Sequence, residues 1–133
     1  MADGGCHCGA VRFSTSGESR HAAYCHCTDC RRVSGAPAAV FVAFRWENVE
    51  FSGEARAYRS SPQVIRRFCP TCGTTLTYED DRLPGDVHLA IGAFDEPERF
   101  PPWEHAFDSD RIAWFDVADS LPRHARFSRQ RRT

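Results

Sequence analysis

Seven cysteines in 133 residues constrain the fold of this chain more than any other feature. They fall into three short groups, which are Cys6 and Cys8, then Cys25, Cys27 and Cys30, then Cys69 and Cys72. An odd number of thiols cannot all pair in disulfides, and the two cysteines of a C-x-C segment cannot bridge each other without strain. Because no secretory signal is visible at the N-terminus, we expect a cytoplasmic, reduced chain whose thiols bind metal.

The remainder of the chain has the composition of one ordinary globular domain. Hydrophobic residues make up 41% and charged residues 26%, which excludes a disordered chain. The longest apolar run, Ala38 to Phe44, is far shorter than the ~20 residues of a membrane helix, so we expect no membrane partner. A net charge of −1 argues against general attraction to nucleic acid. All 17 basic residues are arginine, which excludes a catalytic lysine.

A basic tail ends the sequence. Residues 123–133 carry five arginines and no acidic residue. Such a tail could touch nucleic acid, but a solvated terminus is the simpler interpretation and the one we adopt. We therefore divide the chain into one metal-binding domain over residues 1–122 and a basic C-terminal tail over residues 123–133.

Short strands separated by turn residues predict a mainly β fold of small antiparallel sheets with at most short helices. One helix is expected, over Thr28 to Val33, ended by Gly35 and Pro37. Residues 95–104 are expected to form a loop because they contain three prolines. The expected strands are Val11–Ser14, His21–Tyr24, Ala38–Phe44, Val49–Ser52, Ala55–Arg59, Val64–Phe68, Thr74–Tyr78 and Val87–Ile91. A domain of this kind has a thin core, so a metal is expected to stabilise it.

The segment FCPTCG at 68–73 has the pattern of a zinc knuckle. Pro70 stiffens the turn, and Gly73 lets the backbone curl so that amide N–H groups point at sulfur. A tetrahedral zinc ion takes four ligands, with sulfur at about 2.3 Å. One knuckle supplies only two thiols, so another pair must come from elsewhere in the chain.

Seven thiols divide naturally into four plus three. Cys6 and Cys8 would join the knuckle thiols Cys69 and Cys72 in a closed, structural zinc site, hereafter the quartet. Cys25, Cys27 and Cys30 lie in one local turn and would form an open site with a vacant coordination position, hereafter the trio. Two alternatives stay open at this point. The trio could complete the knuckle and leave spare buried thiols, or four thiolates could hold an iron–sulfur cluster.

Charged and titratable residues beside the trio are candidates for supporting roles. His26 lies inside a C-x-C segment and is expected to point away from the thiols, although it could reach a substrate as an acid or base. Arg31 could offset the excess negative charge of three thiolates around zinc, or hold a substrate carboxylate. Arg66 and Arg67 alternate along an expected strand, so only one of them can face the site. His105 is expected to be a structural histidine.

The sequence resembles the glutathione-dependent formaldehyde-activating enzyme family. The resemblance rests on GCHCGAV at 5–11, CHCTDCRRVSGA at 25–36 and RFCPTCGT at 67–74, with later matches at 91–95, His105, Trp114 and Leu121-Pro122. It implies a β-tent fold, a structural zinc on the quartet and a second, catalytic zinc on the trio, which we expect to be the more labile of the two. It further implies a carbon–sulfur lyase that forms S-(hydroxymethyl)glutathione from glutathione and formaldehyde.

The resemblance places the chemistry at the trio. Its partners would be a small-molecule thiol such as glutathione and an aldehyde, with Cys25, Cys27 and Cys30 as the catalytic thiols, Arg31 as a carboxylate anchor and His26 as a proton carrier. Two other functions are compatible with the residues. One is a non-catalytic zinc module that binds protein or nucleic acid, and the other is a sensor whose trio oxidises reversibly. The sequence carries no signal for an oligomeric state.

Overall fold

Ten short strands and one short α-helix make up the computed structural model, which describes residues 1–132. The strands are β1 Ala2–Gly5, β2 Arg12–Thr15, β3 His21–Cys25, β4 Ala39–Arg45, β5 Val49–Ser52, β6 Arg56–Ser61, β7 Val64–Phe68, β8 Thr75–Asp80, β9 Asp86–Ala90 and β10 His105–Ala106. The helix is α1 Thr28–Ser34, and the 3₁₀ turns are η1 Trp46–Asn48, η2 Ile91–Ala93, η3 Pro97–Arg99 and η4 Asp108–Asp110. The expected mainly β class is confirmed.

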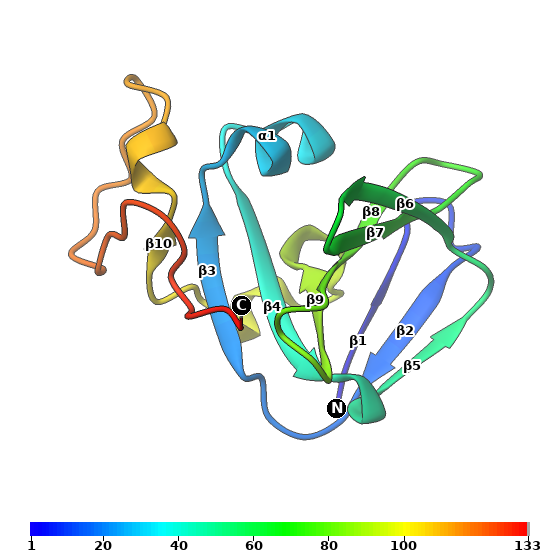
Figure 1. Ribbon diagram of the computed structural model, residues 1–133. Helices are drawn as coiled ribbons and strands as arrows, with labels where there is room; N and C mark the ends of the chain where they lie inside the picture. Colours follow the sequence, from blue (N-terminus) through cyan, green and yellow to red (C-terminus); the bar gives the residue numbers. More distant parts are fainter. Residues whose placement is uncertain (133) are drawn as a thin grey trace.

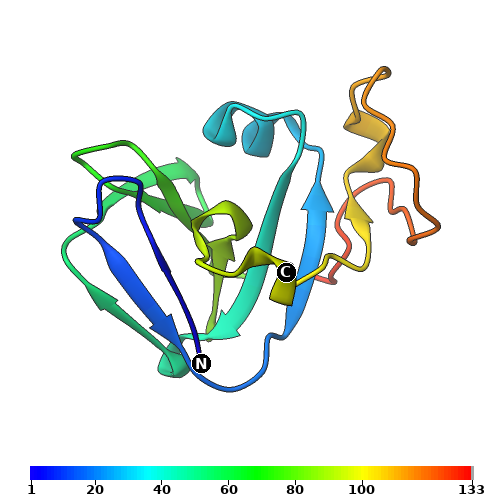
Figure 2. The same cartoon turned by 180° about the vertical axis from the view of Figure 1, so that it is seen from behind.

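The strands form two sheets. A three-stranded sheet has the order β1-β2-β5, and a seven-stranded sheet has the order β10-β3-β4-β9-β8-β7-β6. Both views show the smaller sheet beside the β6–β8 end of the larger one, while β3 and β10 lie on the far side (Figure 1 and Figure 2). All pairings are antiparallel except that of β10 with β3.

Each expected strand and the expected helix are present, with ends within about two residues of the prediction. The helix ends where Gly35 adopts a left-handed conformation at φ +71° and donates its N–H to the carbonyl of Arg31. The two strands that the sequence did not predict are β1 and β10. Both lack a hydrophobic pattern, and they are strands because β2 and β3 supply their hydrogen-bonding partners.

The core lies between the two sheets. Strand β4 is buried on both faces, as its apolar run predicted, and Val42, Ala43 and Phe44 have no exposed surface. Phe13 of the smaller sheet packs edge-on against Phe94, with ring centroids 5.1 Å apart. Two thiols of the quartet are buried in the same cluster, so this metal site borders the core.

The C-terminal residues pack on the domain, and the expectation of a solvated tail is wrong for the described residues. His124 and Arg126 form backbone hydrogen bonds of 2.8 and 2.7 Å with His105 and Phe107. Beyond them the chain passes over the larger sheet, where Arg129 and Arg131 reach buried carboxylates on β9 and β8. Figure 1 shows this segment, in red, returning alongside β3. The basic composition of the tail predicted a solvated segment. In the structure, ion pairs with carboxylates distant in the sequence keep the segment packed on the sheet.

Within residues 1–132, no helix combines the length and apolar character needed to cross a membrane.

Candidate metal centres and the adjoining cavity

Two tight turns from distant parts of the chain bring the quartet together. The Sγ atom of Cys8 lies 3.6 Å from that of Cys6 and 3.7 Å from that of Cys69, and all four sulfurs, including Cys72, lie within 4.8 Å of one another. Four sulfurs at tetrahedral zinc bonds of about 2.3 Å are about 3.8 Å apart. The donor set and its spacing therefore fit one closed zinc site.

Backbone amides support the sulfurs in both turns. In the predicted knuckle, the N–H groups of Thr71 and Cys72 donate to Sγ of Cys69 at 3.4 and 3.5 Å. Gly73 has φ +81°, a conformation that favours glycine, and its N–H donates to the carbonyl of Cys69. The first turn is built in the same way, with Gly9 at φ +84° and the N–H of Val11 donating to sulfur at 3.2 Å.

The trio lies where β3 leads into α1. Cys25 ends the strand, Cys27 caps the helix and Cys30 lies in its first turn. The Sγ atoms of Cys25 and Cys27 are 3.4 Å apart, the N–H of Cys30 donates to Sγ of Cys27 at 3.3 Å, and all three sulfurs lie within 4.8 Å of one another. All seven cysteines are free thiols.

Hydrogen bonding shifts the pKa values of the trio thiols in opposite directions. Donation from Cys25, assisted by Cys30 and its backbone N–H, lowers the pKa of Cys27 to about 2. The same hydrogen bond raises the pKa of Cys25, because Cys25 must keep the proton that it donates. Hydrogen bonding therefore favours the thiolate form of Cys27, and the trio offers three sulfur ligands to a metal.

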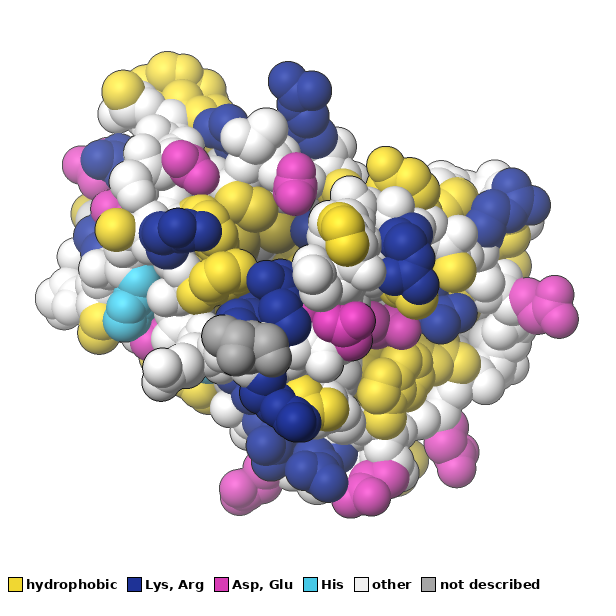
Figure 3. Space-filling view, in the orientation of Figure 1, with side chains coloured by type: hydrophobic (Ala, Val, Ile, Leu, Met, Phe, Trp, Pro, Cys, Tyr) yellow, Lys and Arg dark blue, Asp and Glu magenta, His cyan; other side chains and the backbone are white. Residues whose placement is uncertain are grey.

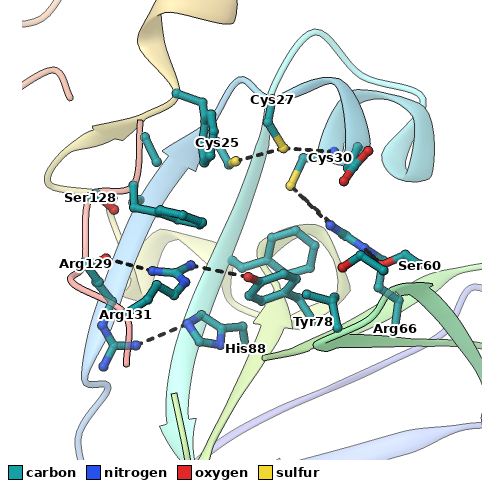
Figure 4. A pocket seen from close by; sticks show the side chains of 18 of the residues that line it. Cys25, Cys27, Cys30, Ser60, Arg66, Tyr78, His88, Ser128, Arg129 and Arg131 are labelled. Carbon is teal, nitrogen blue, oxygen red and sulfur yellow. Dashed lines mark hydrogen bonds between the residues drawn. The ribbon is translucent and has the colours of Figure 1, made fainter. Parts of the chain in front are cut away.

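A cavity of about 340 Å³ opens beside the trio. Figure 4 shows the trio at one end of this cavity, Arg66 on one side, and Arg129 and Arg131 toward the other end. Tyr78 contributes to the surface between them, together with His88 on the neighbouring strand. Both apolar and polar side chains line the cavity, as in small-molecule sites.

Arg66 is the arginine that faces the trio. Its guanidinium nitrogens lie 3.8 and 4.0 Å from Sγ of Cys30, its Nε donates to Ser60 at 3.1 Å, and its charged group lies 5.0 Å from the centre of the Tyr78 ring. Arg66 is 4% exposed. Its neighbour Arg67 points the other way and pairs with a glutamate, so the predicted alternation is confirmed.

Arg31 does not reach the cavity. It follows the trio in sequence, but its guanidinium donates to the carbonyl of Asp110 at 3.0 Å and to the hydroxyl of Thr28 at 3.2 Å. Arg31 is not among the residues that line the cavity, and Arg66 occupies the place beside the thiols that the sequence suggested for Arg31.

His26 is also outside the cavity. It is fully buried, and its Nε2 lies 2.8 Å from Nδ1 of His105, whose Nε2 lies 3.0 Å from Asp119. Burial lowers the pKa of His26. His26 and His105 form a third group of possible metal ligands with Asp108, but Arg123 already pairs with that carboxylate at 2.9 Å. The two histidines are therefore a buried, hydrogen-bonded pair outside the cavity, and Nδ1 of His26 has no hydrogen-bond partner among the described residues.

The end of the cavity away from the trio contains residues that the sequence analysis did not single out. Tyr78 donates its hydroxyl to Asp80 at 2.6 Å, and burial together with this hydrogen bond raises the pKa of Tyr78. Burial opposes ionisation of Asp80, but hydrogen bonds from Arg82 and Tyr78 and the charge of Arg131 outweigh it and lower its pKa to about 2. The alternation of β8 and β9 could have placed Tyr78 and His88 on one face, since they are directly paired.

Known proteins resemble both the sequence and the fold. The family model described as glutathione-dependent formaldehyde-activating enzyme matches residues 1–110. An uncharacterized lyase of Schizosaccharomyces pombe is 32% identical over 76 residues, which are 57% of this chain and 56% of that protein. A candidate glutathione-dependent formaldehyde-activating enzyme of Halomonas elongata is 27% identical over 128 residues, 88% of this chain and 81% of that protein.

A solved structure shows the same fold. A Rhodobacter sphaeroides protein has a crystal structure that matches with a TM-score of 0.59 at 19% identity, covering 92% of this chain and 99% of that one. The matched family region, residues 1–110, contains all seven cysteines of both clusters. The chain therefore belongs to the glutathione-dependent formaldehyde-activating enzyme family.

Proposed function

We propose that this protein is a zinc-dependent carbon–sulfur lyase that forms and cleaves thiol–aldehyde adducts, in the manner of an S-(hydroxymethyl)glutathione synthase. The observation that carries this proposal is the position of the trio, which lies at the edge of a cavity of about 340 Å³ and apart from the closed quartet. The family match and the lyase names of the relatives agree with it.

The two clusters would have different roles. The quartet supplies four thiols and would hold a structural zinc ion, whereas the trio supplies three and would hold a second, more labile one. When bound at the trio, zinc would lower the pKa of a substrate thiol that takes its remaining coordination position.

The addition of a thiol to an aldehyde needs no reactant besides these two. The sulfur of the thiol attacks the aldehyde carbon, a C–S bond forms, and the thiol proton ends on the former carbonyl oxygen. The reverse reaction breaks the C–S bond and returns the proton. The protein would orient the two reactants and balance their charge.

Arg66 provides the charge balance. Three thiolates and one zinc ion leave one excess negative charge, and the guanidinium of Arg66 lies within 4.0 Å of Cys30 to offset it. The raised pKa of Tyr78 keeps its hydroxyl protonated, so Tyr78 offers the cavity a hydrogen-bonding group that does not ionise. His26 has no role in this proposal because the structure holds it outside the cavity.

Nucleic-acid binding by a zinc module is not supported by the arrangement of the tail. Such binding would need a stretch of exposed basic side chains, but the side chains of Arg123, Arg129 and Arg131 are mostly buried against the domain. The free thiols suit a reducing compartment, and a cytoplasmic location stays a prediction.

The test is the rate at which formaldehyde and glutathione exchange with their adduct, followed by NMR exchange spectroscopy. Protein loaded with two zinc ions per chain is expected to raise this rate when present far below the substrate concentration. Fully loaded protein that leaves the uncatalysed exchange rate unchanged would overturn the proposal.

A further inference from the structure

The segment Phe127–Arg131, hereafter the C-terminal wall, forms part of the cavity. Phe127, Ser128, Arg129 and Arg131 all line it, although they follow the trio by about a hundred residues in sequence. Figure 4 shows Arg129 and Arg131 beside His88 and Tyr78, toward the end of the cavity away from the sulfurs. The family match ends at residue 110, so this wall lies outside the part of the chain that the family model describes.

Both arginines of the wall are held in fixed positions. Arg129 donates to Asp86 at 2.9 Å and to Nε2 of His88 at 3.2 Å. Arg131 donates to Asp80 at 3.0 Å and to the Tyr78 hydroxyl at 3.3 Å. Their side chains are 21% and 15% exposed. The guanidinium groups are therefore preorganised before any ligand arrives, which reduces the entropy lost on binding.

The ring of Phe127 supports this arrangement. The guanidinium carbon of Arg131 lies 4.0 Å from the ring centre, and that of Arg82 lies 5.3 Å away. Phe107, next to β10, packs edge-on against the same ring with centroids 5.0 Å apart. One aromatic side chain thus joins the wall to the domain and keeps two cations beside the cavity.

Positive charge exceeds negative charge at this end of the cavity. Asp80 pairs with both Arg82 and Arg131. Asp86 likewise pairs with two arginines, Arg129 at 2.9 Å and Arg20 at 3.0 Å. Each carboxylate therefore meets two guanidinium groups, so four guanidinium groups share two carboxylate partners in these ion pairs. Figure 3 shows basic side chains gathered near the middle of this face of the molecule.

His88 does not cancel this charge or add to it. Its Nε2 accepts the hydrogen bond from Arg129, so the ring is neutral with its proton on Nδ1. That buried Nδ1 has no hydrogen-bond partner among the described residues. The acids that do line the cavity are Asp29 and Asp110, which lie on α1 and η4 beside the trio.

We propose that Arg129 and Arg131 form a carboxylate subsite, where a carboxylate of the substrate thiol reaches the C-terminal wall while its sulfur lies at the trio. This inference rests on the proposed lyase function, in which the thiol is glutathione-like, and adds the residues that select it. Guanidinium groups match the planar, two-oxygen geometry of a carboxylate. A bound carboxylate would balance the excess positive charge at this end. A neutral thiol lacks that charge, so it is expected to bind more weakly than an acidic one.

The first experiment compares glutathione with its dimethyl ester as the thiol, with formaldehyde as the aldehyde. The two share a skeleton and differ in the charge of both carboxylates. We expect wild-type kcat/KM to favour the acid by about tenfold or more, the size of one charge-assisted hydrogen bond. Arg129→Gln and Arg131→Gln should remove most of this preference, mainly through KM. Asp86 and Asp80 each keep a second arginine in these variants, so the fold should tolerate them.

The matched control is Arg126→Gln, which removes the same charge from an exposed residue that does not line the cavity. It should keep the wild-type preference for the acid. A wild-type enzyme that handles acid and ester equally, or an equal loss of preference in all three variants, contradicts the subsite.

The second experiment measures binding without turnover. S-methylglutathione and its dimethyl ester are titrated calorimetrically into the zinc-loaded protein. Tighter binding of the acid, lost in Arg129→Gln and Arg131→Gln but kept in Arg126→Gln, supports the subsite even if no thiol is turned over, in which case only the lyase function fails. Equal binding of acid and ester by an active enzyme overturns the subsite and leaves the lyase function standing.

Discussion

The guanidinium of Arg66 on β7 lies 3.8 Å from the sulfur of Cys30 on α1, although the two residues are 36 positions apart in the sequence. This contact joins the sheet to the thiol cluster and places a fixed positive charge on the cavity side of the trio. This buried arginine packs against the sulfur of Cys30 and the ring of Tyr78, and it would balance the negative charge that thiolates of the trio carry when they bind a metal. Arg66 therefore supplies the positive charge nearest to the sulfur of Cys30 in the candidate site.

Replacing Arg66 tests that role. We expect Arg66→Gln to lower kcat/KM by about tenfold to a hundredfold, because one charge-assisted contact to the site is lost. Steady-state kinetics and zinc content at the trio are the measurements. Arg67→Gln is the control, since Arg67 sits on the same strand but pairs with Glu79 on the other face. Equal effects of the two variants would show that Arg66 has no special relation to the trio.

Serine substitutions should separate the two clusters. Cys27→Ser is expected to abolish turnover and remove one zinc ion, while the melting temperature changes little, because serine is a favoured helix N-cap and Cys27 is the N-cap of α1. Cys69→Ser should remove the other zinc ion and strongly destabilise the protein, since Cys69 is fully buried beside the core. Metal analysis and thermal unfolding measure both effects. If Cys27→Ser unfolds the chain as Cys69→Ser does, the trio is structural.

Metal removal should occur in two stages. A chelator is expected to take the zinc of the trio first, because three protein ligands hold a metal less tightly than four. Activity should disappear at this stage while the circular dichroism spectrum and the melting temperature stay close to those of the loaded protein. Release of the quartet zinc should then coincide with unfolding. A single release step that removes both ions together would contradict the division into a structural and a labile site.

Stability should fall as the pH drops below about 6.5. Burial and the charge of Arg129 lower the pKa of His88 to about 3, so between pH 6.5 and 3 the unfolded chain binds a proton that the native protein does not. Above the unfolded pKa, His88 therefore does not reduce the free energy of unfolding. Below that pKa, it lowers the free energy of unfolding by up to about 1.4 kcal/mol per pH unit. Denaturant unfolding at pH 7 and pH 5.5 measures the slope.

The variant His88→Gln isolates this contribution. It removes the titrating ring, so its stability should depend less on pH than that of the wild type over the same window. Burial lowers the pKa of His21 as well, and that residue should supply a smaller slope in both proteins. Identical slopes for wild type and variant would show that His88 titrates as it does in the unfolded chain.

The sequence by itself determined the local features of this protein. The knuckle turn at Gly73, the helix that ends at Gly35 and the strand that alternates Arg66 with Arg67 depend on neighbours in the chain, so their residue patterns predicted them. Spacing favoured a division of the cysteines into four and three but left other groupings open, and the structure brings the sulfurs together as four and three.

Only the tertiary structure decided which charged groups meet the thiols and the cavity. Arg31 adjoins the trio in sequence yet bonds to Asp110 and Thr28, whereas Arg66 reaches the trio from β7. The tail carried a local pattern typical of a solvated segment, but Asp80 and Asp86 draw Arg131 and Arg129 onto the sheet from more than forty residues away. Ion pairs between such distant residues have no local sequence pattern from which they could be predicted. They form only because the fold places the two surfaces side by side.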